Sequence, residues 1–148
     1  MKKITLILVL LFSFVKINAQ TTVPYVEVNM GFSSGIIPFF PGASVLYGAT
    51  TKYESGILLD YQGGIAFPSL ITGKFGIGCN IDKSELTVGI RPWPASTYAQ
   101  IKLNRDNKNS DIIISVEKMW SREIFIQDAI FTIGWRFDNK KYKDIRHK

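Results

Sequence analysis

Few residues of this 148-residue chain have the types and spacing that catalysis requires. The one histidine, His147, is next to the last residue, so hydrolysis with a histidine as the base is not expected. Asp60, Glu85 and Glu117 could do acid–base chemistry, but ion pairing is the commoner role of acids inside a fold. A lipid-modifying enzyme would depend on Asp60 or Glu117. We predict instead that the protein is not an enzyme.

The sequence also has few residues that could bind a metal or a cofactor. Cys79 is the one cysteine, whereas a disulfide framework and a thiolate-rich zinc or iron–sulfur site both need several. The glycines of Gly76-Ile77-Gly78 lie within an expected strand, not at the strand-to-helix turn that holds a phosphate. We therefore expect no cofactor and no metal.

Residues 1–19 have the pattern of a secretory signal peptide. Lys2 and Lys3 precede an apolar run from Ile4 to Val15, and small or polar residues follow up to Ala19. The apolar run is about a dozen residues, shorter than the roughly 20 that a helix needs to cross a bilayer, which disfavours a retained anchor. We expect cleavage after Ala19 and export through the inner membrane.

The positive charge lies mainly at the two ends of the chain. There are 18 basic and 12 acidic residues, for a net charge of +6. Three basic residues lie in the leader and five in the tail at 138–148, so ten remain in the body against ten acidic residues. A neutral body does not indicate a nucleic-acid surface, and the basic tail is expected to be a solvated terminus.

Strict two-residue alternation recurs in segments of about ten residues, separated by turn residues, and predicts eight strands. The last segment shows it most clearly: Ile133, Trp135 and Phe137 alternate with Gly134 and Arg136. Eight such strands suit an all-β, antiparallel up-and-down barrel over residues 20–137. The predicted strands are Tyr25–Phe32, Ala43–Tyr53, Ser55–Phe67, Leu70–Ile81, Ser84–Trp93, Ser96–Asn104, Asp111–Trp120 and Asp128–Phe137.

Alternation alone leaves two orientations of this barrel open. An apolar face turned inward gives a soluble secreted barrel of lipocalin type that binds a lipophilic ligand, and one turned outward gives a transmembrane barrel. Aromatic residues near strand ends favour lipid, because such rings prefer the membrane interface. Glycines on the polar face suit a crowded interior. The aromatic residues are Tyr53, Phe67, Trp93, Trp120, Trp135 and Phe137, and the glycines are Gly31, Gly48, Gly56, Gly64, Gly76, Gly78, Gly89 and Gly134.

From Tyr25 to Phe137 the sequence resembles the small eight-stranded outer-membrane barrels of OmpA and OmpX type from Gram-negative bacteria. The resemblance implies a monomer in outer-membrane lipid, with both termini in the periplasm and four longer connections outside. The ending Trp135-Arg136-Phe137 resembles the aromatic signal for the barrel assembly machinery, although eleven residues follow it here.

Charged residues on the polar face predict an ion-pair network that closes the lumen. A two-residue turn at Asp82-Lys83 would set Lys74 opposite Arg91, with Asp60 as the acid within reach. Lys102, Asp111 and Arg136 would lie at one level with Glu85 nearby. A lumen closed in this way favours a structural or interaction role over a general pore. The predicted network comprises Asp60, Lys74, Glu85, Arg91, Lys102, Asp111 and Arg136.

Two connections are too apolar for ordinary solvated loops, and closure of the barrel would make them neighbours. They predict a hydrophobic patch on the external rim that contacts an unidentified protein partner or the membrane boundary. Alternatively, these residues extend the strands, with a bulge near Gln127. The patch comprises Ile36, Ile37, Phe39, Phe40, Ile124, Phe125 and Ile126.

Overall fold

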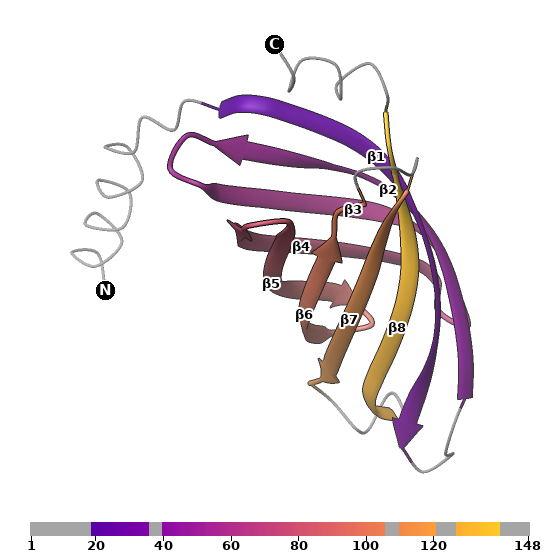
Figure 1. The fold of residues 1–148 in the computed structure, drawn as a ribbon. Coiled ribbons are helices and arrows are strands. Elements are labelled where there is room, and N and C mark those ends of the chain that lie inside the picture. The colour runs from indigo at the N-terminus through magenta and orange to yellow at the C-terminus, as the bar shows by residue number, and fades with distance from the viewer. Residues whose placement is uncertain (1–18, 36–39, 106–109, 121–126, 140–148) are drawn as a thin grey trace, which may run out of the picture.

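The computed structural model describes residues 19–35, 40–105, 110–120 and 127–139, and confirms the all-β barrel. Eight antiparallel strands pair in chain order, and the last closes against the first (Figure 1). Within these ranges no helix is long and apolar enough to cross a membrane. The strands are β1 (Ala19–Gly35), β2 (Phe40–Tyr53), β3 (Ile57–Phe67), β4 (Leu70–Ile81), β5 (Ser84–Trp93), β6 (Ser96–Leu103), β7 (Asp111–Met119) and β8 (Gln127–Asp138).

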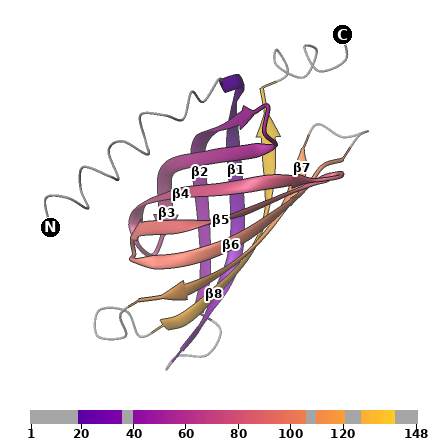
Figure 2. The same ribbon diagram turned by 90° about the vertical axis from the view of Figure 1, so that its left-hand side faces the viewer.

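The seam between β1 and β8 closes the barrel. The two strands lie side by side in Figure 1 and Figure 2, and their pairing runs from Tyr25 opposite Asp138 to Gly35 opposite Gln127. It sets Glu27 opposite Arg136, which brings the first and last parts of the fold together. Closure leaves no long unpaired edge between these two strands.

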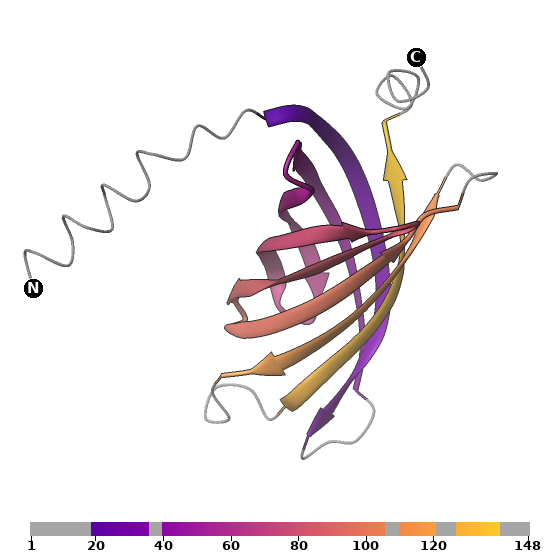
Figure 3. The ribbon, with the colours of Figure 1, turned by 60° about the vertical axis from the view of Figure 1, so that its left-hand side comes forward.

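The barrel has two distinct ends. The start of β1 and the end of β8 lie at the same end, which we call the terminal end; the opposite end is the distal end (Figure 1). Figure 3 shows β4 to β6 strongly inclined to β1 and β8, as closure of a small barrel requires. Odd-numbered strands therefore finish at the distal end, and even-numbered strands at the terminal end.

Two of the four distal connections are short, contrary to the expectation of four longer ones. Pro68-Ser69 alone joins β3 to β4, and Pro94-Ala95 alone joins β5 to β6. Proline supplies no N–H to a ladder and has a fixed φ, so it suits a tight turn. In the sequence, a short connection is indicated at both places by a proline that directly follows the aromatic residue at the end of a strand.

β1 begins at Ala19, six residues before the predicted strand start at Tyr25, because Pro24 does not interrupt the strand. Residues 19–24 of β1 pair with β2 and lie beyond the pairing with β8. The carbonyl of Pro24 accepts a hydrogen bond from the Asn139 N–H, so its nitrogen also faces the β8 side. A proline there removes no hydrogen bond from the β1–β2 ladder.

The inner and outer faces of this barrel differ in polarity. Large apolar side chains lie on the outside: Met30 is 58% exposed, Ile77 51% and Ile133 50%. The inward positions of the same strands are mainly polar and buried, as at Asn29, Thr72 and Arg136. Cys79 is also exposed, on the outward face of β4. The alternation seen in the sequence thus separates a polar interior from an apolar outer surface.

Glycines make room in the interior for two buried tyrosines. A Cβ on Gly48 would lie 2.8 Å from the Tyr25 hydroxyl, and one on Gly89 would lie 2.8 Å from Cε1 of Tyr98. Gly56 is different from the other predicted wall glycines. It lies in the turn after β2 with a φ of +80°, a backbone conformation that glycine adopts readily.

Candidate functional site in the barrel interior

The interior holds three clusters of buried charges, to which all eight strands contribute. All seven residues of the predicted network are buried inside the barrel, and four further charged residues join them. From the middle of the barrel outward we name the seam cluster (Glu27, Asp60, Arg136), the mouth cluster (Lys74, Arg91, Glu117) and the basal cluster (Lys52, Glu85, Lys102, Asp111, Asp138).

The seam cluster joins β1, β3 and β8 through a single guanidinium. Nε and Nη2 of Arg136 donate to Oε2 of Glu27 at 2.9 and 2.7 Å, and Nη1 donates to Oδ1 of Asp60 at 3.1 Å. The guanidinium also lies 3.7 Å from the centre of the Tyr25 ring. A planar, multidentate donor suits this position better than a point charge would.

Two hydroxyl groups complete the seam cluster by donating to Asp60. The Tyr25 hydroxyl lies 3.0 Å from both carboxylate oxygens, and Oγ1 of Thr50 lies 2.6 Å from Oδ1. Asp60 is only 1% exposed, so these bonds replace the water that its carboxylate loses. Asp60 therefore accepts hydrogen bonds from Arg136, Tyr25 and Thr50.

The mouth cluster places two cations on one carboxylate near the distal end. Oε1 of Glu117 lies 2.9 Å from Nζ of Lys74 and 2.7 Å from Nη2 of Arg91. Oε2 of Glu117 lies 3.3 Å from the Ser96 hydroxyl, and Lys74 also lies 5.1 Å from the centre of the Tyr98 ring. The cluster therefore carries one more positive than negative charge.

The basal cluster lies near the terminal end, where even-numbered strands finish and odd-numbered ones begin. Nζ of Lys102 lies 3.0 Å from Glu85, 3.7 Å from Asp111 and 3.9 Å from Asp138. Lys52 pairs with the other oxygen of Glu85. Two lysines and three acids thus link β2, β5, β6, β7 and β8.

Two of the predicted partners differ in the structure. Asp60 forms an ion pair with Arg136 and not with Lys74 or Arg91. The acid that pairs with Lys74 and Arg91 is Glu117. Arg136 is opposite Asp111 in the β7–β8 register, yet its guanidinium binds Glu27 and Asp60 instead. The predicted proximity of Lys102, Asp111 and Glu85 agrees with the observed contacts.

The β4–β5 hairpin shows why the partner of Lys74 was hard to predict. The turn at Asp82-Lys83 sets the expected register from Ile81 opposite Ser84 up to Phe75 opposite Ile90. The ladder then shifts by one residue, so that Gly73 pairs with Trp93. Such a shift changes the direction of the neighbouring side chains, which in this hairpin are those of Lys74 and Arg91.

Sequence reasoning missed Glu27, Lys52, Asp138 and the buried Tyr25. Glu27 and Tyr25 share the inward phase of β1 with Asn29, and this alternation was a usable signal. The pairing of Glu27 with Arg136 could not be predicted from the sequence, because no turn joins β1 to β8 and fixes their register.

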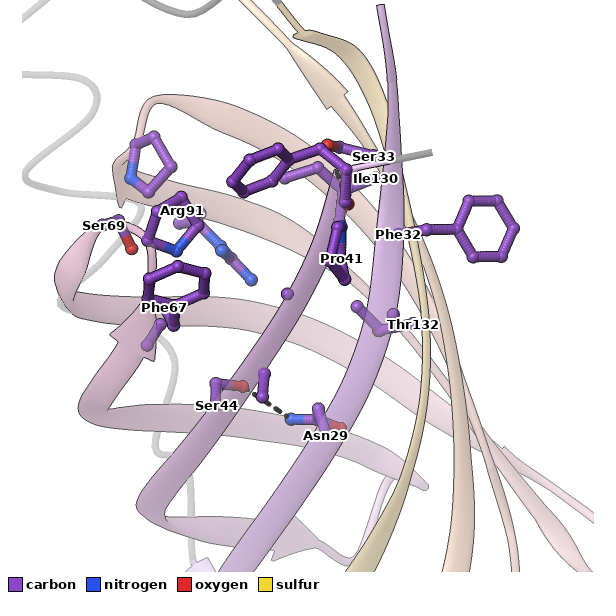
Figure 4. A pocket seen from close by; sticks show the side chains of 17 residues that line it. Asn29, Phe32, Ser33, Pro41, Ser44, Phe67, Ser69, Arg91, Ile130 and Thr132 are labelled. Atoms are coloured by element: carbon purple, nitrogen blue, oxygen red, sulfur yellow. Dashed lines mark hydrogen bonds between the residues drawn. The ribbon is translucent and has the colours of Figure 1, made fainter. Parts of the chain in front are cut away.

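A cavity of about 70 Å³ lies above the mouth cluster at the distal end (Figure 4). Asn29, Ser44 and Thr132 line its inner side, while Phe67 and Pro41 belong to its exposed rim. Arg91 reaches it from β5 and is the one charged residue among the described residues that line it. The cavity is therefore apolar at its rim and polar at its base.

Of the predicted external patch, the structure describes Phe40 alone. Phe40 begins β2, pairs with Ser33, and its ring stacks on Phe67 with centroids 6.2 Å apart. That placement agrees with the alternative in which these residues extend the strands. Ile36, Ile37, Phe39, Ile124, Phe125 and Ile126 lie outside the described residues.

The acids of the three clusters take part in ion pairs that link different strands. The carboxylates considered for acid–base chemistry, Asp60, Glu85 and Glu117, each bind at least one cation. Among the residues that the structure describes, no group of three His, Cys, Asp or Glu side chains could hold a metal ion.

Comparison with protein-family models, curated proteins and solved structures found no match to this chain.

Proposed function

We propose that the protein is a transmembrane β-barrel of the outer membrane of a Gram-negative bacterium, similar to the OmpA and OmpX type. The observation that carries this proposal is the difference in polarity between the outer and inner faces. Large apolar side chains are exposed on the outside of β1 to β5, β7 and β8, whereas most of the buried side chains are polar or charged. Lipid is the solvent in which such an outer surface is stable, and a closed barrel satisfies every backbone group there.

Aromatic side chains at both ends of the wall support this orientation. Phe67, Trp93 and Trp120 are exposed at the distal end, where β3, β5 and β7 finish. Trp135 and Phe137 are exposed near the terminal end of β8. Two separated girdles of this kind are typical of membrane barrels, because the rings favour the boundary between lipid and water.

We propose a structural or interaction role for this barrel, without enzymatic activity or a general pore. The three clusters span the interior from one end to the other, and each is cross-linked between strands. Eight strands enclose only enough space for side chains to fill. An interaction role would use the external rim, where an unidentified protein partner is proposed to bind.

Delivery to the membrane is part of the same proposal. The leader at 1–19 would direct export, and the aromatic ending at Trp135 and Phe137 would be read by the barrel assembly machinery. Cleavage after Ala19 would remove one residue from the start of β1, whose next residues pair with β2 alone.

Cell fractionation tests the proposal against a soluble secreted barrel that binds a lipophilic ligand. The transmembrane barrel is expected in the outer-membrane fraction, released by detergent, with a gel mobility that changes on boiling. Recovery of the mature protein from the periplasm without detergent, with a lipophilic ligand bound, would contradict it and support the soluble alternative.

A further inference from the structure

The mouth cluster and the cavity above it together have the features of a ligand site. Arg91 is 7% exposed, and its Nη2 binds Glu117, but its Nε is buried without a hydrogen-bond partner. An unpaired N–H of a buried guanidinium is costly, so a ligand or solvent acceptor is expected beside it. Figure 4 shows the Arg91 side chain directed inward, toward the side of the cavity formed by β1 and β2.

The charges around Arg91 favour an anion as that acceptor. Lys74 and Arg91 share Glu117, which leaves the mouth cluster with one excess positive charge. Glu117 does not line the cavity, so Arg91 alone sets the charge of the lining formed by described residues. Glu27 of the seam cluster also attracts Lys74, whereas no acid among the described residues lines the cavity beside Arg91. A counter-ion in the cavity would stabilise the buried charge of Arg91.

Hydroxyl groups on the opposite wall can complete the binding of an anion. The Ser44 hydroxyl accepts a hydrogen bond from Nδ2 of Asn29 at 3.3 Å, so its own proton can be donated elsewhere. Oγ1 of Thr132 is buried and has no partner. Both residues line the cavity with Arg91, and together the three supply donors from β2, β8 and β5.

The size and the rim of the cavity limit the rest of the ligand. A volume of about 70 Å³ accommodates a few heavy atoms. Phe40, Pro41 and Phe67 supply apolar surface to the lining of the cavity. We propose that this cavity binds a small organic anion: a carboxylate on a short apolar chain, with the carboxylate at Arg91 and the chain between the rim residues.

The test is titration of the folded, detergent-solubilised protein with butyrate, n-butanol and n-butylamine, followed by nuclear magnetic resonance. Butyrate is expected to give saturable shifts of the Ser44 and Thr132 amide signals, whereas the alcohol and the amine are not. Absence of saturable shifts with butyrate, or equal binding of n-butanol, would overturn the proposal. Neither result bears on whether the barrel spans a membrane, which fractionation decides separately.

Variants separate the site from general effects on folding. Arg91→Gln should weaken butyrate binding about tenfold or more, because a hydrogen bond to a charged group is lost. Ala66 lines the cavity from β3. Ala66→Leu should therefore fill the cavity, leave the pair of Arg91 with Glu117 intact and abolish binding. Ala99→Leu, on the outward face of β6, is the matched control and should bind normally. Native affinity in folded Arg91→Gln or Ala66→Leu, or lost affinity in Ala99→Leu, would overturn the proposal.

Discussion

At the scale of single residues, Glu117 is the group on which the mouth cluster depends. Glu117→Gln leaves Lys74 and Arg91 buried without a countercharge. We expect a loss of about 3 kcal/mol in the free energy of unfolding, since removal of one partner of a buried pair is strongly destabilising. Urea unfolding in lipid vesicles measures this loss.

Asp82→Asn is the control for that substitution. Asp82 is exposed in the turn between β4 and β5, and asparagine tolerates its φ of +52°. Its free energy of unfolding should be nearly unchanged. Equal stabilities of the two variants would show that the mouth cluster does not stabilise the barrel.

Arg136 is predicted to require its guanidinium and not only its charge. Arg136→Lys retains the positive charge but cannot bind Glu27 and Asp60 at the same time while lying over the Tyr25 ring. We expect a loss of about 2 kcal/mol in the free energy of unfolding, by the same urea measurement. A lysine variant as stable as the native protein would mean that charge alone matters at the seam.

At the scale of the elements, strand packing depends on glycines that face the interior. A Cβ added at Gly89 would overlap the carbonyl oxygen of Phe75 and crowd the Tyr98 ring, whereas one at Gly63 would lie 3.8 Å from its nearest neighbour. Gly89→Ala should therefore destabilise the barrel by about 2 kcal/mol. Gly63→Ala is the matched control and should have little effect. Similar heat-modifiability midpoints for both variants would contradict this account of the packing.

The strands were largely predictable because alternation and turns are local signals. Leu70–Ile81 and Ser84–Trp93 have their predicted bounds in β4 and β5, since a two-residue turn fixes both strand ends and register. The candidate site was only partly predictable. Which acid meets Arg136 depends on the register of the β1–β8 seam, and no turn encodes that register.

At the scale of the whole molecule, the charged interior predicts a barrel that does not conduct freely. Three cross-linked clusters occupy successive levels between the two ends. Planar bilayer recordings of the purified protein should show no large, stable single-channel steps. Such steps would contradict a closed lumen, because ions would then have a continuous aqueous path through the buried charges.

The central claim is that the apolar outer wall faces lipid. It is tested most directly by tryptophan fluorescence in vesicles of lipids brominated at different depths, with two single-tryptophan proteins compared. One retains Trp93 at the end of β5; the other carries Val88→Trp near the middle of the same strand, and all remaining tryptophans are replaced by phenylalanine. Shallow bromines should quench Trp93 more strongly, and deep bromines should quench the tryptophan of the Val88→Trp protein. Absence of quenching in both proteins would contradict the claim.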